Sequence, residues 1–373
     1  MNDLIVFGED YGALPSSTQH LISRIANTRQ VLWVNSIGLR QPRFNKADLT
    51  RVGQKLLGRG KSAQVGMQSS DIPSSIQVIN VRTIPAPSSK FGRIVAAVLT
   101  RAQIKPWIRK LNLNAPILWT SLPTVADLCG TLGESSVVYY CGDDFSALAG
   151  VDHHTVREHE RRLVEQADMI LTASEKLQHK FPADKQRLLT HGVDCQLFSS
   201  PSIRANDLPD GDRPIAGFYG SLSSWLDYEL LNQVIVEMPD WDFVFIGPNE
   251  MKSNPLIKAD NVFVLGARPH SELPSYSQHW TVSLLPFLNN SQIEACNPLK
   301  LKEYLAARRP IVTTEFPALD PYRTHINIVE DKTSLISTLR QLEAHPDLLP
   351  EGIVDNESWD NRVVTLERYL ESL

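Results

Sequence analysis

The chain has 373 residues, a length that predicts two domains of ordinary size. With 42% apolar and 21% charged residues, its composition is that of a soluble globular protein. No run of about 18 apolar residues predicts a transmembrane helix, and the start MNDLIVFGED has neither the basic region nor the cleavage site of a signal peptide. The four cysteines are scattered without a C-x-x-C pair, which argues against a disulfide framework or a structural zinc site. We therefore expect a cytoplasmic protein.

The net charge of -5 is unevenly distributed along the chain. Residues 40–112 contain 14 lysines or arginines and only 2 acidic residues, a net charge of +12. The stretches RQPRFNKADLTRVGQKLLGRGKS and KFGRIVAAVLTRAQIKPWIRKL combine these charges with large apolar residues. Such a pattern is typical of a helix on an anionic membrane surface, although an ordinary helix with a basic outer face is an equal alternative. Nucleic acid is disfavoured because no binding motif accompanies the charge.

The first half of the chain alternates short apolar runs with segments of helical length. Strands are predicted at 4–7, 31–34, 76–81, 116–120, 137–140 and 169–173, and helices at 16–28, 90–110, 122–132 and 154–167. Strands that are apolar throughout and alternate with helices indicate a parallel sheet covered on both faces. The polar stretch SSPSIRANDLPDGDRP, residues 199–214, follows and predicts a linker.

The same pattern restarts after this linker. Strands are predicted at 215–220, 242–247, 262–266, 281–287, 310–314 and 326–330, and helices near 225–237, 271–278, 298–308, 331–344 and 357–372. The sequence thus predicts an α/β protein with two doubly wound, Rossmann-like domains in tandem. Because ligands of such sheets bind beyond the carboxyl ends of the strands, we expect the site in a cleft between the domains.

The stretch NPLKLKEYLAARRPIV carries the clearest ligand-binding pattern. We expect Asn297 to cap a helix whose first residue is Pro298. The amides at this helix start, at positions 298 and Leu299, could hold a diphosphate together with the charge of Lys300. One turn further on, Glu303 could accept hydrogen bonds from both hydroxyls of a ribose. The alternative is a solvated ion pair between Lys300 and Glu303 on an ordinary helix.

Two glycine turns follow predicted strands of the second domain. Gly220 and Ser221 come after the strand at 215–220, and Gly247 ends the strand at 242–247. Glycine lets a ligand approach the backbone closely, so we expect all three residues to line the donor site, with a plain β–α turn as the alternative. The dinucleotide fingerprint G-x-G-x-x-G is missing at Gly220 and also after the first strand.

The first domain offers two further candidates at strand ends. Asp143 and Asp144 follow the strand at 137–140, where paired carboxylates could bind a sugar hydroxyl or act as a base. A helix cap or turn is the alternative for them, and a metal site is not predicted because no third ligand accompanies the pair. Tyr11 and Gly12 belong to the loop after the first strand, which should reach the same edge of the sheet.

With these motifs, the chain resembles bacterial glycosyltransferases of the GT-B fold, most closely the family-4-like group (glycosyltransferase group 1) of surface polysaccharide synthesis. The resemblance covers nearly the whole chain and is carried by NPLKLKEYLAARRPIV, GVDCQLF, GFYGSLSSWLDYELL, VFVLGARPHSELPSY and YYCGDDFSA. The final SWDNRVVTLERYL resembles the terminal helix that crosses back to the first domain. The resemblance implies an acceptor-side domain at 1–200, a donor domain at 213–355 and a crossover helix at 356–373.

The resemblance also implies a nucleotide-sugar donor, UDP- or GDP-linked, with no bound cofactor and no required metal. Glu303 matches the second glutamate of the family's E-x7-E motif, which holds the donor ribose. The sequence departs from the motif at its other end, where position 295 is Ala295 and Glu294 comes one place early. It also lacks the basic pair that usually follows the first strand of the donor domain, so neutralisation of the phosphates falls on Lys300, helped by Arg268.

In the family, a histidine–aspartate element near the first-domain strand end helps to place the sugar. Asp143 and Asp144 stand near that place without a histidine, and we expect them to be the catalytic residues. The expected function is a retaining, metal-independent hexosyl transfer to a surface glycan or a lipid-linked acceptor at the inner face of the plasma membrane. The alternatives are a nucleotide-sugar epimerase of the same fold, a dinucleotide-dependent oxidoreductase and a non-catalytic partner subunit.

Overall fold

The computed structural model describes residues 2–12, 16–36, 72–84, 87, 89–147, 152–345 and 347–373. The chain divides into two compact units, of which unit 1 is Met1–Thr190 with Arg362–Leu373 and unit 2 is His191–Asn361. Each unit is built on one parallel sheet, which confirms the predicted pair of α/β domains. The limits predicted at residues 200, 213 and 355 stay predictions. The four cysteines are free, as expected.

Unit 1 contains a seven-stranded parallel sheet of order β3-β2-β1-β4-β5-β6-β7. Its strands are β1 (Leu4–Phe7), β2 (Val31–Val34), β3 (Ile76–Ile79), β4 (Ile117–Thr120), β5 (Ser136–Cys141), β6 (Met169–Thr172) and β7 (Gln186–Leu188). The first six lie where the apolar runs predict them, and four-residue strands such as β1, β2 and β4 are buried throughout. β7 was not predicted because its sequence QRL is polar and half-buried, as is usual at a sheet edge.

The helical segments of unit 1 are α1 (Ser17–Ile25), α3 (Lys90–Lys110), η2 (Pro123–Leu128), α4 (His153–Gln166) and α5 (Glu175–Gln178). Side chains of the preceding Ser16, Ser89 and Asp152 cap α1, α3 and α4. The helix predicted at 122–132 is wrong, since only a 3-10 segment forms there. Gly130 and Gly133 follow it in the left-handed region, with φ of 75° and 84°, which a continuing helix excludes.

Unit 2 contains a six-stranded parallel sheet of order β10-β9-β8-β11-β12-β13. Its strands are β8 (Ile215–Tyr219), β9 (Asp242–Ile246), β10 (Val262–Gly266), β11 (Val282–Leu285), β12 (Ile311–Thr313) and β13 (Asn327–Ile328). Its helices are α6 (Cys195–Ser199), α7 (Tyr228–Glu237), η3 (His270–Glu272), α8 (Pro274–Ser277), α9 (Ser291–Ala295), α10 (Leu299–Ala307), η4 (Pro317–His325), α11 (Lys332–Ala344) and η5 (Asp355–Glu357). The helix predicted at 271–278 is two shorter pieces, η3 and α8, joined at Pro274.

The strand order places one topological switch point in each sheet. In unit 1 the chain runs outward from β1 to β3 and then returns to β4 on the other side of β1. In unit 2 the same reversal occurs between β8 and β11. Ligands of open α/β sheets bind beyond the carboxyl ends of the two strands that flank such a reversal. The residues just after β1 and β8 are therefore the first places to look for a site.

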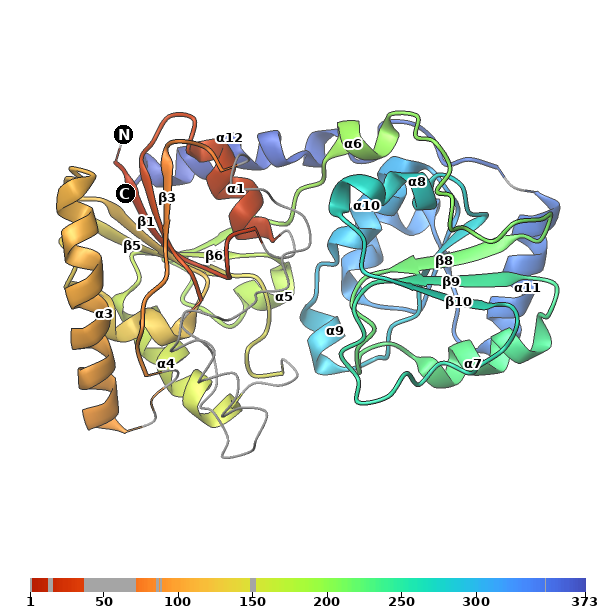
Figure 1. Ribbon diagram of the computed structural model, residues 1–373, viewed down its shortest axis with the longest axis horizontal. Helices are drawn as coiled ribbons and strands as arrows, with labels where there is room; N and C mark the ends of the chain where they lie inside the picture. The colour runs from red at the N-terminus through yellow and green to blue at the C-terminus, as the bar shows by residue number, and fades with distance from the viewer. Residues whose placement is uncertain are drawn as a thin grey trace. The chain divides into compact units, whose positions relative to one another are not determined.

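The last helix, α12 (Trp359–Leu370), begins in unit 2 and ends in unit 1 (Figure 1). Glu367 forms an ion pair with the buried Arg29, and the Tyr369 hydroxyl donates a hydrogen bond to the Leu188 carbonyl at 3.3 Å. At its start, the Trp359 indole packs on Gly192 so closely that a β-carbon there would lie 2.7 Å away. These contacts confirm the predicted terminal helix that returns to the first domain.

Candidate functional site

The end of β8 meets the start of α10 through a lysine and two glycines. The side chain of Lys300 covers Gly220, where a β-carbon would lie 2.2 Å from Cε and 3.1 Å from Nζ of the lysine. Gly247, at the end of the neighbouring β9, lies against Gly220 in turn, since its β-carbon would stand 1.9 Å from the Gly220 carbonyl oxygen. Both glycines have φ above 140°, a conformation that other residues rarely adopt. Three predicted donor-site residues are thus in contact at the switch point of unit 2.

The start of α10 differs by one residue from the prediction. Pro298, with φ -70° and ψ 123°, occupies the cap position and Leu299 is the first helical residue, so Asn297 is not the cap. The short helix α9 precedes it and is capped by Asn290. Because proline has no N–H, the amides available to an anion at this helix start belong to Leu299 and Lys300 and not to position 298.

Glu303 lies one turn further along α10 and is only 8% exposed. Its Oε1 atom is 2.7 Å from Nε2 of His270, which lies in η3 after β10. Burial alone would raise the pKa of Glu303, but the hydrogen bond and charge of His270, with the charge of Lys300, bring it below its ordinary value. The pKa of His270 is raised, because Glu303 more than offsets the effect of burial. The alternative of a solvated Lys300–Glu303 pair is therefore wrong.

Aromatic side chains pack beside the His270–Glu303 pair. Tyr219 stacks on Phe198 and Trp280, and its ring meets that of Tyr304 edge-on at 4.8 Å. The Tyr219 hydroxyl is buried and faces the Glu303 carboxylate, without completing a hydrogen bond of normal geometry to the described residues. A buried hydroxyl of this kind is unusual in a purely structural position. It leaves a donor at the carboxylate that a ligand hydroxyl can satisfy.

His270 is the functional candidate that the sequence did not reveal. The stretch VFVLGARPHSELPSY carries part of the family resemblance, but its histidine is one of ten in the chain and belongs to no predicted site. The available signal was its position just after β10, at the same sheet edge as Gly220 and Gly247. A histidine at a strand end, where other candidates gather, is a stronger indication than its spacing to other histidines.

Arg268, expected to assist at the phosphates, is held by protein groups. Its NH2 nitrogen lies 2.6 Å from Asp207 Oδ2, and its Nε donates to the Tyr276 hydroxyl at 3.0 Å. Tyr276 in turn donates to the other oxygen of Asp207 at 2.7 Å. This network fixes part of the segment 199–214, so that the predicted linker is anchored to unit 2. Ser221, next to Gly220, is half-buried at the same strand end.

The two aspartates of unit 1 differ in their surroundings. Asp144 accepts hydrogen bonds from Lys180 Nζ at 2.6 Å and from the Ser146 hydroxyl at 2.6 Å. Although burial raises the pKa of Asp144, these hydrogen bonds bring it below the ordinary value. Asp143 is exposed, and its carbonyl oxygen accepts from the Cys141 thiol at 3.3 Å. Asp144 thus serves the local turn, and Asp143 is the more open of the pair.

Hydrogen bonds from two sides hold the loop after β1 in place. The Tyr11 amide donates to Asn35 at 2.9 Å and its hydroxyl pairs with Ser23, while the Gly12 amide donates to the Gln19 side chain at 3.0 Å. Within this loop, Oε1 of Glu9 is buried and has no hydrogen-bond partner among the described residues. Burial raises the pKa of Glu9. A buried carboxylate oxygen without a partner, at the switch point of unit 1, marks a place for a ligand hydroxyl.

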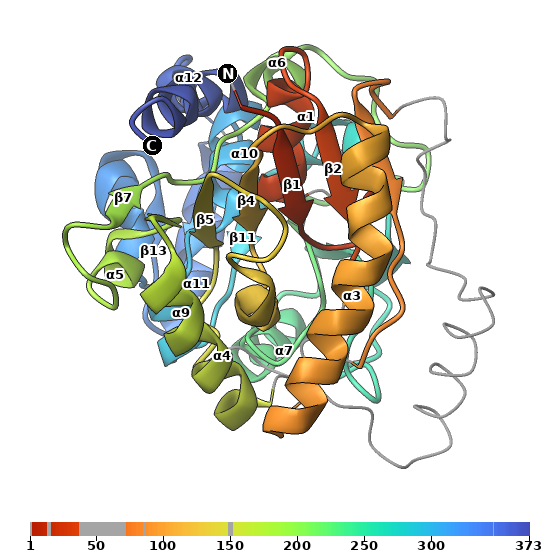
Figure 2. The ribbon, with the colours of Figure 1, turned by 90° about the vertical axis from the view of Figure 1, so that its left-hand side faces the viewer.

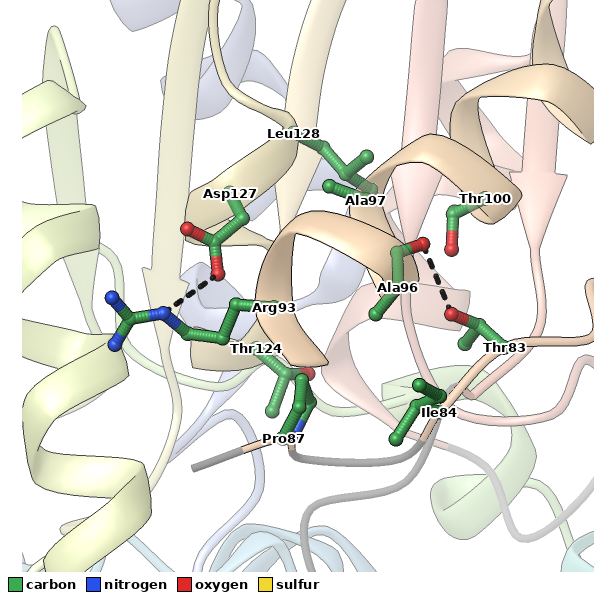
Figure 3. Close-up of a pocket in the computed structure, with 10 residues that line it drawn as sticks. All are labelled: Thr83, Ile84, Pro87, Arg93, Ala96, Ala97, Thr100, Thr124, Asp127 and Leu128. Carbon is green, nitrogen blue, oxygen red and sulfur yellow. Dashed lines mark hydrogen bonds and ion pairs between the residues drawn. The ribbon is translucent and has the colours of Figure 1, made fainter. Parts of the chain in front are cut away.

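A small cavity lies apart from both of these places. It lies in unit 1 between α3, η2 and the residues Thr83, Ile84 and Pro87, with Arg93 and Asp127 at one side (Figure 3). Its volume of about 20 Å³ accommodates one water molecule. Among the described residues, no group of three or more His, Cys, Asp or Glu could hold a metal ion. No helix in the described part of the chain is long and apolar enough to cross a membrane.

The chain is similar to known proteins both in sequence and in structure. Residues 213–344 match the sequence model of the family described as Glycosyl transferases group 1. TuaH of Bacillus subtilis strain 168, named as a teichuronic acid biosynthesis glycosyltransferase, is 26% identical over 280 residues, 68% of this chain and 70% of that protein. The crystal structure of HepE from Anabaena, in complex with UDP and glucose, matches with a TM-score of 0.70 at 12% identity over the full length of both chains. A UDP-forming α,α-trehalose-phosphate synthase from Burkholderia vietnamiensis matches with a TM-score of 0.62 at 12% identity, over 100% of this chain and 97% of that one.

The structural matches concern the fold, and they confirm the predicted GT-B architecture of two α/β units. The family match lies wholly within unit 2, the unit that contains Gly220, Lys300 and Glu303. The sequence match to the Bacillus protein extends over two thirds of the chain. The family match and the sequence relative are both described as glycosyltransferases, and the fold is compatible with them.

Proposed function

We propose that this chain, a glycosyltransferase of the GT-B fold, moves a hexose from a nucleoside-diphosphate donor to a glycan acceptor of cell-surface polysaccharide synthesis. One observation carries the proposal. Lys300 lies over Gly220 at the end of β8, at the start of the helix that buries Glu303 one turn later. A cation and free amides at one end, with a carboxylate at the other, match the phosphates and the ribose hydroxyls of a nucleotide.

The donor diphosphate would bind at the start of α10. The amides of Leu299 and Lys300 and the Lys300 ammonium supply positive charge, and Gly220 and Gly247 leave the backbone open to close approach. As the sugar leaves, negative charge grows on the diphosphate, so these fixed donors stabilise the transition state more than the ground state. We propose that this charge is provided by the protein and that no metal is required.

The ribose would reach the Glu303 carboxylate. His270 already occupies Oε1 and helps to keep the carboxylate ionised, which fixes its orientation. The remaining acceptor capacity, together with the Tyr219 hydroxyl, would receive the ribose hydroxyls. The sugar itself would lie near Glu294, the residue that comes one place before the expected glutamate.

The acceptor would bind at the switch point of unit 1. The unpartnered oxygen of Glu9 would accept a hydrogen bond from an acceptor hydroxyl, in a loop braced through Tyr11 and Gly12. Asp143, the more exposed aspartate, would contact donor sugar or acceptor, and Asp144 would hold its turn. We propose retention of the anomeric configuration, as the resemblance implies. We also propose a lipid-linked acceptor, because the region 40–112 carries a net charge of +12.

The first experiment is thermal unfolding of the wild type in the presence of UDP, GDP, ADP, CMP, dTDP or NADH. We expect one nucleoside diphosphate to stabilise the protein and to lose this effect in Glu303→Gln, which preserves an acceptor for His270. The matched variant Glu294→Gln should keep the response to the diphosphate and lose part of the response to its sugar derivative. Release of the diphosphate from that nucleotide sugar then establishes catalysis, and the anomer of the product establishes retention. Stabilisation by NADH alone, or by no nucleotide, would overturn the proposal in favour of an oxidoreductase or a non-catalytic subunit.

A further inference from the structure

α3, the longest helix in the part of unit 1 that the structure describes, packs on the core with one face and exposes the other. Its buried residues Ala96, Thr100 and Ile104 are four apart and form a single stripe. This stripe faces the interior, where the Thr83 hydroxyl donates to the Ala96 carbonyl at 3.1 Å (Figure 3). Figure 2 shows α3 along the side of unit 1. The opposite face of the helix therefore points away from the core of this unit.

That outer face is apolar in its first half. Phe91, Ile94 and Val98 are 77%, 54% and 48% exposed, and their spacing of three and four residues aligns them on one side of the helix. Ile84 and Leu99 are also exposed, at 40% and 44%. No other helix or strand of the described chain exposes more than one large apolar side chain. Single exposed apolar residues need no explanation, whereas a continuous row of them indicates an interaction surface.

The same face is cationic in its second half. Three basic residues continue the row at the same helical spacing. Arg101 lies seven residues beyond Ile94, Lys105 lies seven beyond Val98, and Arg109 lies four beyond Lys105. The sequence from 89 to 110 contains six basic residues and no acidic residue. At about 1.5 Å per residue the row extends for roughly 27 Å. The other basic stretch, RQPRFNKADLTRVGQKLLGRGKS, includes Arg51, Lys55 and Arg59 and lies outside the described residues.

We propose that the outer face of α3, formed by Phe91, Ile94, Val98, Arg101, Lys105 and Arg109, docks on the surface of an anionic lipid bilayer. Apolar side chains would enter the boundary between headgroups and acyl chains, and the basic side chains would meet the lipid phosphates. Charge complementarity favours a bilayer over a second copy of this chain, because two such faces would bring six cations together without an acid on either helix. The proposal rests on the lipid-linked acceptor of the proposed function, but lipid binding is measurable without donor or acceptor.

The test is flotation of the full chain with vesicles of phosphatidylcholine alone or mixed equally with phosphatidylglycerol. We expect binding to the anionic vesicles only. Phe91→Ser with Ile94→Ser should lower the partition coefficient at least about tenfold, because two apolar side chains no longer enter the bilayer. Lys105→Glu should lower it about fivefold or more, because one cation at an anionic surface is lost and its charge is reversed.

A matched pair of variants tests whether vesicle binding depends on this face of α3. Val98→Glu should abolish binding, whereas Val236→Glu, at a still more exposed valine of α7 in unit 2, should leave it unchanged. Wild-type thermal unfolding and an unchanged nucleotide response in each variant exclude misfolding and separate this proposal from the donor site. Equal binding by Val98→Glu and the wild type, or no binding to anionic vesicles, would overturn it. A concentration-dependent dimer in sedimentation experiments that Val98→Glu dissociates would also overturn it, since the face would then bind a second copy.

Discussion

Nε2 of His270 lies 2.7 Å from Oε1 of Glu303, and both side chains are largely buried at the carboxyl edge of the sheet in unit 2. The pair joins η3 to α10, two segments that approach each other only in the fold. It keeps a carboxylate charged in a place where burial alone would favour the neutral acid. The charge of Glu303 is therefore maintained mainly by the hydrogen bond and the charge of His270.

The first prediction concerns the pH dependence of this pair. The pKa of His270 is above its usual 6.5, so its stabilisation is complete below pH 6.5 and is lost as the pH rises through the folded-state pKa. The pKa of Glu303 is below its usual 4.5, so its stabilisation is present above pH 4.5 and is lost as the pH falls through the folded-state pKa. In urea unfolding, we expect His270→Gln to cost about 2 kcal/mol near pH 5.5 and less near pH 8.5. A cost that is independent of pH would contradict a charged pair.

The second prediction concerns the contact of Gly220 with Lys300. Gly220→Ala should destabilise unit 2 by about 1–3 kcal/mol, since its φ is 142° and the new methyl group would collide with the lysine side chain. It should also abolish stabilisation by the nucleoside diphosphate, because Lys300 must move. Gly211→Ala is the matched control, with φ 113° and no atom within 4 Å of a β-carbon. We expect it to unfold more easily and yet to keep the nucleotide response. Loss of that response in both variants would point to general damage and against the proposed phosphate site.

Much of the fold follows from the sequence, for physical reasons that particular elements illustrate. Strands β1, β2 and β4 are apolar at every position because both faces of their sheet are covered, and such runs are unambiguous. α3 was predicted with its observed limits; in the structure Ser89 caps its start and Asn112, with φ 52°, follows its end. The short segments α5, α6 and α9 were missed, since four or five residues are too few to show a helical period.

The sequence predicts those parts of the candidate site whose residues lie close together along the chain. Lys300 and Glu303 belong to one helix, so their common side follows from spacing alone. The partners that decide their state do not follow from spacing. His270 reaches Glu303 from 33 residues away, and Asp207 holds Arg268 from 61 residues away. Whether a charged side chain is free or already paired depends on such distant contacts, and a single sequence carries no record of them.

The third prediction contrasts a buried lysine with an exposed one. Lys302 is 2% exposed and donates to the His191 carbonyl and to Glu357, which holds it at 2.6 Å. Lys302→Met should cost about 3 kcal/mol in urea unfolding, because it leaves the Glu357 carboxylate without its main counter-charge. Lys332 pairs with Glu237 at the surface, and Lys332→Met should cost less than about 1 kcal/mol. The double variant Lys302→Met with Glu357→Gln should recover part of the loss, and equal costs for the two lysines would contradict the structural role of Lys302.

The last prediction separates a ligand-binding role of Glu9 from a structural one. Burial, more than the nearby charge of Asp10, raises the pKa of Glu9 above its usual 4.5, although hydrogen bonds from its own backbone and from Gln19 oppose this shift. The raised pKa favours the folded state below pH 4.5, and this contribution is lost as the pH rises through the folded-state pKa. Glu9→Gln, which is neutral at every pH, should therefore be more stable than the wild type by about 1 kcal/mol near pH 7 and not near pH 4.

If Glu9 receives an acceptor hydroxyl, the same variant should lose sugar transfer at least about tenfold while diphosphate binding and donor hydrolysis persist. Asp10→Asn, in the same loop and bonded to the Ser36 amide, should retain transfer. A stabilised Glu9→Gln with full transfer would show that the buried acid is only a cost to the fold, and the acceptor would then have to bind elsewhere in unit 1.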